Sequence, residues 1–357
     1  MNRSNKSKTY ANLALPGMIA VGLIWSLGLL GFGLLRNLQQ PESLTDQSQP
    51  LPGQQLSKYS LFAQVPEVPL GRFKYSGSPD WSPIRLVVDS AIQAERREYQ
   101  LSYVQPVDKA VNSTTAIELL LQDKLSFVQS GRPLRPAEIQ RAQEKGYNLQ
   151  QTPVAMDGIA IAVHPSLPIK GLTLSDLAKI YQGQVTNWQQ LGGPNLKIQP
   201  YSLSVQAEET VDLFLEQVMK GKSYGRSLEF LPTMTESLRQ LAASPGGIFF
   251  GSAAEIIPQC SIKPLAIAED DQPWISPYQA PYVSSTNCPN QRNRINAQAF
   301  ITQQYPLTHQ LYVIYKAGET ENPGNAYAQL LLSHQGQELL DKAGFVGILK
   351  HSRGKLP

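Results

Sequence analysis

The chain has 357 residues, with 31 Lys and Arg against 28 Asp and Glu, and a formal net charge of +3. This length accommodates a membrane anchor and roughly two domains. The positive balance is weak, and basic residues nowhere run together with interleaved aromatic residues. Both features argue against a nucleic-acid partner.

The N-terminal region carries an apolar segment that is long enough to cross a bilayer. Residues 9–35 have no charged side chain, and the apolar stretch 13–35 exceeds the roughly 20 residues that a membrane helix needs. Three basic residues precede it and only Arg36 follows closely, which predicts a cytoplasmic segment 1–12 and an extracytoplasmic remainder. A cleaved signal peptide is the alternative, although its apolar region is usually shorter.

The remainder divides into a tether and an α/β region. Residues 36–70 are rich in Gln, Pro, Ser and Leu without periodicity, which predicts a flexible linker. From Phe73 onward short apolar strands alternate with helices, and this alternation predicts open α/β sheets with helices on both faces. The expected elements are a helix capped by Ser82 and opened by Pro83, a helix over 114–122, a strand over 159–163, a helix following Thr173, a helix over 208–219, strands over 248–251 and 311–315, and one long helix over 325–343.

The most specific stretch is 153–193, PVAMDGIAIAVHPSLPIKGLTLSDLAKIYQGQVTNWQQLGG. Its strand is followed by a helix that Thr173 can cap, with Asp176 three residues on. The order of these sequence motifs resembles the middle segment of the phosphate-binding proteins that deliver phosphate to ABC importers. Further motifs similar to those of the family, such as Pro245-Gly246-Gly247-Ile248, extend the resemblance over about 73–348.

The resemblance implies the two-lobed periplasmic binding fold (type II), with two open sheets and a hinge that the chain crosses twice. The first lobe is expected over 71–157 plus 262–350, and the second over 158–261. Ligands of open α/β sheets bind at strand carboxyl ends and helix N-termini, which places the ligand between the lobes.

Four short polar stretches precede helices or follow strands, and such places favour anions because backbone N–H groups are free there. They coincide with the four ligand-binding loops of the family. The resemblance therefore implies ligand-binding roles for Ser78, Ser113, Thr114, Ser130, Arg132 and Thr210. A solvated surface arginine is the alternative for Arg132, and helix caps are equally consistent with Ser113 and Thr114.

The same loops depart from the family pattern at Pro79, Asp80, Gly131, Glu208 and Glu209. Pro79 and Asp80 stand where the family has a hydroxyl pair, and Gly131 stands where phosphate-specific members usually have an Asp. Glu208 and Glu209 replace Ser and Gly before Thr210, so acids stand where donors are expected. First-turn acids of a helix are the ordinary explanation, and a direct functional role is the alternative.

The two cysteines, Cys260 and Cys288, are predicted to form a disulfide because the expected topology places them in an oxidising compartment. Two separate buried thiols are the alternative. The cysteines are far apart and have no nearby His, so no metal site is expected. The four histidines are scattered, and His309 is interpreted as an ordinary polar residue.

The primary hypothesis is a non-enzymatic, membrane-tethered solute-binding protein in the periplasm or outside the cell. Its expected partners are a small oxyanion, phosphate above all, the inner membrane through the N-terminal helix, and an ABC permease as a candidate; it needs no cofactor. The alternative is a non-transporting sensor or interaction module, which Asp80, Glu208 and Glu209 favour. An anchored hydrolase of phosphate esters is a third hypothesis, but the sequence has no recognisable nucleophile–base pair.

Overall fold

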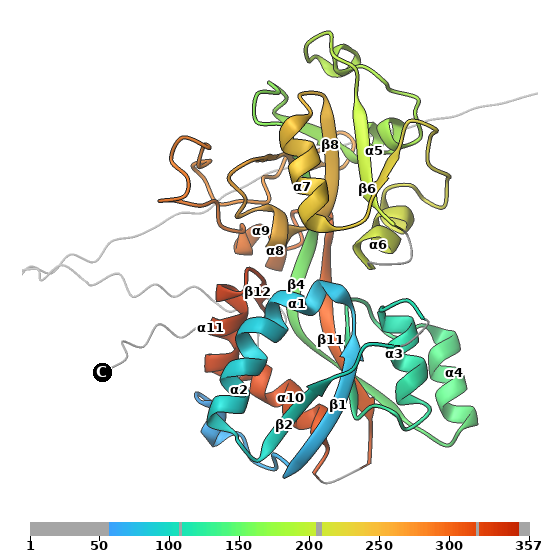
Figure 1. Ribbon diagram of the computed structural model, residues 1–357, viewed down its shortest axis with the longest axis vertical. Coiled ribbons are helices and arrows are strands. Elements are labelled where there is room, and N and C mark those ends of the chain that lie inside the picture. Colours follow the sequence, from blue (N-terminus) through green and yellow to red (C-terminus); the bar gives the residue numbers. More distant parts are fainter. Residues whose placement is uncertain (1–56, 107–108, 205–208, 319–320, 350–357) are drawn as a thin grey trace, which may run out of the picture. The chain divides into compact units, whose positions relative to one another are not determined.

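The computed structural model of the chain describes residues 57–106, 109–204, 209–318 and 321–349 (Figure 1). Within these ranges no helix combines the length and the apolar character that crossing a bilayer requires. The predicted cytoplasmic segment 1–12, the predicted anchor 13–35 and Glu208 lie outside the described residues.

Strand β4 (Leu149–Val163) connects two groups of strands (Figure 1). Its first part pairs antiparallel with β11 (Thr308–Lys316), and its last five residues pair antiparallel with β8 (Gly247–Ser252). From Val154 to Val163 every residue is buried, and Asp157 is the one charged side chain among them. The predicted strand 159–163 is therefore the second part of a longer element.

The first group of strands, which we call lobe 1, has the order β2-β1-β3-β11-β4. β1 is parallel to β2 and β3, whereas β11 is antiparallel to β3. Its main core is aromatic, with Tyr75, Phe127 and Tyr327 stacked at centroid distances of 4.7–6.3 Å. The elements here are η1 (Phe62–Gln64), β1 (Gly71–Gly77), η2 (Pro79–Trp81), α1 (Ser82–Ile84), η3 (Arg85–Asp89), α2 (Ser90–Glu95), β2 (Tyr99–Tyr103), α3 (Ser113–Leu120), β3 (Phe127–Ser130), α4 (Pro136–Glu144), α10 (Pro323–Leu332), α11 (His334–Lys342) and β12 (Val346–Gly347).

The second group, lobe 2, continues the sheet as β4-β8-β6-β7, with β6 parallel to β8 and β7. Tyr181, Phe214 and Phe250 form the centre of its core, and the last two rings stack at 3.8 Å. Its elements are β5 (Gly171–Thr173), α5 (Leu174–Tyr181), η4 (Trp188–Leu191), β6 (Gln199–Leu203), α6 (Glu209–Gln217), β7 (Glu229–Leu231), α7 (Met234–Ala243), α8 (Ala253–Ile256), β9 (Lys263–Pro264), β10 (Ala266–Ala268) and α9 (Ala297–Ile301).

The second passage of the chain between the lobes is predicted near residue 262. Ile267, Phe300 and Leu307 belong to the core of lobe 2, and Leu311 belongs to that of lobe 1. These memberships favour a passage nearer residue 307. Phe62 and Val65 are also buried in lobe 1, which extends the folded part to the N-terminal side of residue 71.

Two local predictions are wrong for identifiable reasons. The long helix expected over 325–343 is two helices, because Ser333 has an extended backbone between them and its hydroxyl accepts the Gly336 N–H at 3.0 Å. Ser82 is predicted to cap the first helix, but Ser78 is the capping residue. The chain enters η2 before α1, and Ser78 Oγ accepts the Asp80 N–H at 3.2 Å. Ser82 is already helical, with Pro83 in the first turn.

Two other predictions are confirmed. Thr173 and Asp176 exchange reciprocal hydrogen bonds of 3.0 Å at the start of α5, which is the predicted capping pair. Cys260 and Cys288 form a disulfide with their Cα atoms 5.7 Å apart. The disulfide spans a separation of 28 residues and lies in the stretch that follows α8.

Candidate functional site

The candidate site begins where β1 and β3 end, side by side, at one edge of the lobe 1 sheet. Ser78 follows β1, Ser130 is the last residue of β3, and Ser113 is the first residue of α3. All three are fully buried. We call the space bounded by Ser78, Ser113, the Gly131 N–H and Arg132 the anion cradle. Parallel strand ends and a helix N-terminus converge there, as anion sites in α/β sheets require.

The carboxylate of Glu209 occupies the anion cradle. Glu209 opens α6 in lobe 2 and is only 2% exposed. Its Oε2 accepts the Gly131 N–H at 3.0 Å, and its Oε1 lies 3.6 Å from Arg132 Nε. Burial raises the pKa of the Glu209 carboxyl, while the Ser113 hydroxyl, the Arg132 charge, the Ser78 hydroxyl and the Gly131 N–H act to lower it. An acid of the chain itself thus receives the donors predicted for a ligand.

Gly131 leaves the room that this carboxylate needs. A Cβ atom at residue 131 would lie 2.5 Å from Glu209 Oε2, a separation that real Cβ atoms essentially never show. The Gly131 N–H also points toward Ser113 Oγ at 3.2 Å, so the donor is shared between the hydroxyl and the carboxylate. The two departures predicted at 131 and 209 are therefore structurally linked.

Arg132 is buried, with 6% exposure, so the solvated-surface alternative is wrong. Its guanidinium donates to both Glu138 carboxylate oxygens, at 2.7 and 3.0 Å, and to Thr114 Oγ1 at 2.7 Å. Burial would raise the pKa of Glu138, but the bonds from Arg132 and the Arg135 N–H hold it below its ordinary value. Most of the charge of Arg132 is thus neutralised within lobe 1.

Glu138 is a residue of the site that the sequence did not predict. The signal was present, because Pro136 opens α4 and Glu138 stands two residues later, where a carboxylate reaches back to the N-cap N–H. Nothing in that local pattern indicates that the same carboxylate also binds Arg132, since this contact depends on the path of the loop between them.

A second contact joins the lobes beside the cradle. Thr210 Oγ1 donates to Asp80 Oδ2 at 3.2 Å, and both side chains are buried. Asp80 comes from η2 in lobe 1, and Thr210 from α6 in lobe 2. Together with the Gly131–Glu209 bond, this contact holds the start of α6 against the cradle without an external ion.

The predicted ligand residues all lie in or next to the cradle. Ser130 differs from the others because its hydroxyl bonds within its own loop. Ser78, Ser113, Arg132 and Thr210 contact the Glu209 or Asp80 carboxylates or bound their space. Thr114 accepts from Arg132, whereas the Ser130 hydroxyl donates to Arg132 O at 2.6 Å and serves its own loop. Pro79 is the first residue of η2. Their roles toward an external ligand stay predictions.

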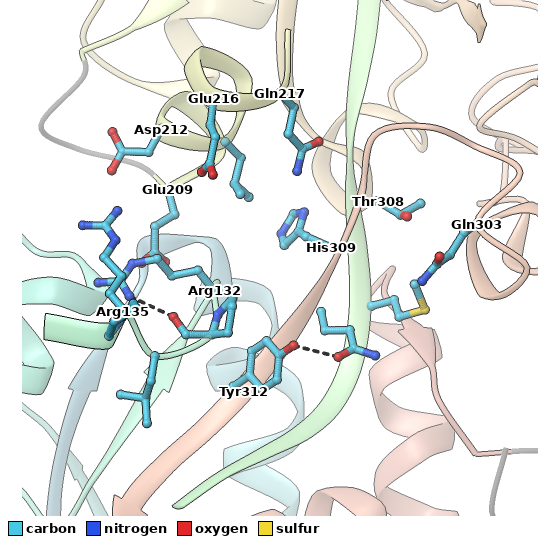
Figure 2. A pocket seen from close by; sticks show the side chains of 16 residues that line it. Arg132, Arg135, Glu209, Asp212, Glu216, Gln217, Gln303, Thr308, His309 and Tyr312 are labelled. Atoms are coloured by element: carbon cyan, nitrogen blue, oxygen red, sulfur yellow. Dashed lines mark hydrogen bonds and ion pairs between the residues drawn. The ribbon is translucent and has the colours of Figure 1, made fainter. Parts of the chain in front are cut away.

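A cavity of 510 Å³ adjoins the cradle between the lobes. Arg132 and Glu209 form the wall that it shares with the cradle, and Arg135, Asp212, His309 and Tyr312 line other sides. Figure 2 shows Asp212, Glu216 and Gln217 extending from α6 toward the side that holds Arg135 and His309. Among the described residues, no group of three or more His, Cys, Asp or Glu side chains could hold a metal ion.

The fold and the cradle define a two-lobed α/β binding protein of the periplasmic type, a class of non-enzymatic ligand receptors. The chain belongs to the PBP superfamily domain family, whose family model matches residues 66–335. The curated relatives are distant in sequence. The chain is 26% identical over 254 residues to the phosphate-binding protein PstS of Pseudomonas aeruginosa, and the match covers 67% of this chain and 72% of that protein.

Two further comparisons agree with this family. The chain is 26% identical over 161 residues to Protein SphX of Synechococcus elongatus, covering 43% of this chain and about half, 48%, of that protein. It is also similar to an ABC-type phosphate transport receptor from Vibrio cholerae, with a TM-score of 0.60 and 19% identity over 77% of this chain and 99% of that one. At this identity the structural likeness establishes the fold alone.

Proposed function

We propose that the chain is a membrane-tethered, extracytoplasmic binding protein whose anion cradle is filled by its own Glu209, and that it acts as a non-transporting sensor or interaction module. The observation that carries this proposal is the Gly131 N–H···Glu209 Oε2 bond of 3.0 Å inside the cradle. This bond engages an N–H donor of the cradle that an external oxyanion would otherwise be able to use.

Electrostatics supports the same conclusion. An oxyanion that entered the cradle would meet the carboxylates of Glu209 and Asp80, both at most 3% exposed. Like charges at such short range repel strongly where water is excluded. The phosphate ion would also have to displace Glu209 and break the Thr210–Asp80 contact that accompanies it.

The second candidate is a phosphate receptor for an ABC permease. Ser78, Ser113 and Arg132 are retained around the cradle, and the names of the relatives describe phosphate-binding proteins. In that case Glu209 would swing out when phosphate arrives. The two candidates differ in the phosphate affinity of the unmodified protein.

Calorimetry of the purified full-length protein with phosphate, sulfate and arsenate tests the proposal. We expect no binding in the micromolar range for the natural chain, and binding strengthened at least tenfold by Glu209→Gly, which empties the cradle. Glu236→Gln is the matched control, because Glu236 is also a first-turn glutamate in lobe 2 but is exposed. Sub-micromolar phosphate binding by the natural chain would instead establish the receptor.

The tether is tested separately. Protease added to intact spheroplasts should digest the folded domain if residues 13–35 anchor it outside the cytoplasm. A protected domain would contradict this topology, and a soluble form beginning just after residue 35 would indicate a cleaved signal peptide instead.

A further inference from the structure

The cavity next to the cradle has the size and position of a ligand site. Its 510 Å³ fall within the roughly 300–1,000 Å³ typical of small-molecule pockets. It lies between the two lobes, where closure would bury a ligand, and its lining comes from α6 of lobe 2, the loop before α4 of lobe 1, and β11. It remains open although Glu209 fills the cradle itself (Figure 2).

The charges of this cavity are opposite to those that an oxyanion needs. Arg132 is engaged by Glu138, and Glu209 stands beside it. The remaining charged lining groups are one guanidinium, Arg135, and two carboxylates, Asp212 and Glu216. Asp212 and Glu216 are exposed, line the cavity and form no ion pair within 4.0 Å of any described residue, although the charges of Arg135 and Arg132 act on the Asp212 carboxyl. One guanidinium against two carboxylates leaves a negative charge on this lining.

The other walls suit a short aliphatic body. Leu134, Met156 and Leu213 contribute apolar surface, and the Tyr312 ring adds an aromatic face that also attracts cations. The His309 ring lies in the wall next to the hinge, and both of its nitrogens are buried without a hydrogen-bond partner in the described part of the chain. Burial lowers the pKa of His309, so the ring adds no positive charge at neutral pH.

The geometry points to a small organic ammonium compound as the ligand of this cavity, with its ammonium group at Asp212 and Glu216 and its aliphatic part against Leu134, Met156 and Leu213. This inference rests on the proposed occupation of the cradle by Glu209, which excludes an oxyanion from the neighbouring space. Arg135, on the lobe 1 side, would receive a carboxylate if the ligand were a zwitterion.

Calorimetry and thermal unfolding of the full-length protein test this with four probes: butan-1-amine, butane-1,4-diamine, 4-aminobutanoate and butanoate. We expect at least one ammonium compound to bind and to raise the unfolding temperature, since ligands that bind only the folded state stabilise it. Butanoate, which has the same chain length but no ammonium, should do neither. Binding of 4-aminobutanoate above that of butan-1-amine, lost in Arg135→Gln, would identify a zwitterion, and equal binding would identify a simple amine.

The double variant Asp212→Asn/Glu216→Gln should weaken ammonium binding at least tenfold. Asp270→Asn/Glu269→Gln removes the same two charges from exposed residues that do not line this cavity, and should leave binding unchanged. The inference is overturned if no ammonium compound binds, if butanoate binds equally well, or if the cavity variant keeps its affinity. None of these outcomes depends on phosphate, so the calorimetry with oxyanions judges the proposed function independently.

Discussion

Gly131 of lobe 1 and Glu209 of lobe 2 are in direct contact: the Gly131 N–H donates to Glu209 Oε2 at 3.0 Å. A Cβ atom at residue 131 would occupy the space of that oxygen. We therefore expect Gly131→Ala to expel the carboxylate and to destabilise the protein by about 1–3 kcal/mol, the usual cost of overpacking a buried site. Urea unfolding of the two proteins measures the difference.

A double-mutant cycle separates this contact from a general effect of alanine. In a Glu209→Ala background, Gly131→Ala should cost less than about 0.5 kcal/mol, because the clashing oxygen is gone. Equal costs in both backgrounds would mean that Glu209 does not occupy the cradle in solution.

Arg132 and Glu138 form a buried ion pair, and we expect its disruption to lower the free energy of unfolding substantially. Arg132→Met leaves Glu138 and Glu209 buried without their cation, a situation that typically costs about 3–5 kcal/mol. Arg132→Met/Glu138→Gln should recover part of the loss. Arg141→Met is the matched control, because the ion pair of Arg141 with Glu118 is half exposed and should contribute less than about 1 kcal/mol. Chemical denaturation compares all four proteins, and similar losses for both arginines would refute the buried pair.

The disulfide is expected to stabilise the folded state by about 3–4 kcal/mol, because closing a loop of this length restricts the unfolded chain. Cys260→Ser/Cys288→Ser should lower the unfolding temperature, and reduction of the natural protein should bring it to the same value. A reduced protein that unfolds at the temperature of the oxidised one would show that this loop is already constrained by other contacts.

Much of the fold was predictable because its signals are local. The capping pair Thr173 and Asp176 and the apolar run 159–163 at the end of β4 depend on residues close together in sequence. The break at Ser333 was missed because apolar residues continue with helical spacing on both sides of it. The core clusters favour a passage near residue 307, and no local pattern indicates it, since it depends on which core receives Phe300 and Leu307.

In the site, too, local features were predictable and contacts between distant segments were not. The sequence predicts that acids enter the ligand loops, and it leaves open whether Glu209 caps its helix or acts in the pocket. In the structure Glu209 is a first-turn acid of α6, and its carboxylate accepts the Gly131 N–H of the other lobe. Contacts between lobes such as this one, and the pairing of Arg132 with Glu138, depend on tertiary arrangement that no local pattern encodes.

The last prediction concerns Glu255, in the first turn of α8 beside the hinge. Burial, and then the negative charge of Asp157, raise the pKa of the Glu255 carboxyl to about 7. Asp157 itself is fully buried and accepts bonds from Ser252 Oγ at 2.5 Å and from the Ala254 N–H at 3.2 Å. The folded protein therefore keeps a proton on Glu255 up to about pH 7.

The sign of the effect follows from proton linkage. An unfolded glutamate has a pKa of about 4.3, so between about pH 4 and 7 the folded state holds a proton that the unfolded state has lost. This contribution to stability is complete below about pH 4 and disappears as the pH rises through 7. Glu255→Gln carries no charge at any pH, so it should match the natural protein at about pH 4 and exceed its stability by about 1–3 kcal/mol at pH 8.

Urea unfolding of both proteins at pH 4, 5, 6, 7 and 8 measures this difference. Subtracting the two curves removes the contributions of other titrating groups, including His309 and Asp157, provided that their surroundings are unchanged. Glu236→Gln is the control, because Glu236 is also a first-turn glutamate but lies exposed in α7. A Glu255→Gln curve that runs parallel to that of the natural protein would show that Glu255 is solvated in solution and that the hinge carries no buried acid at this residue.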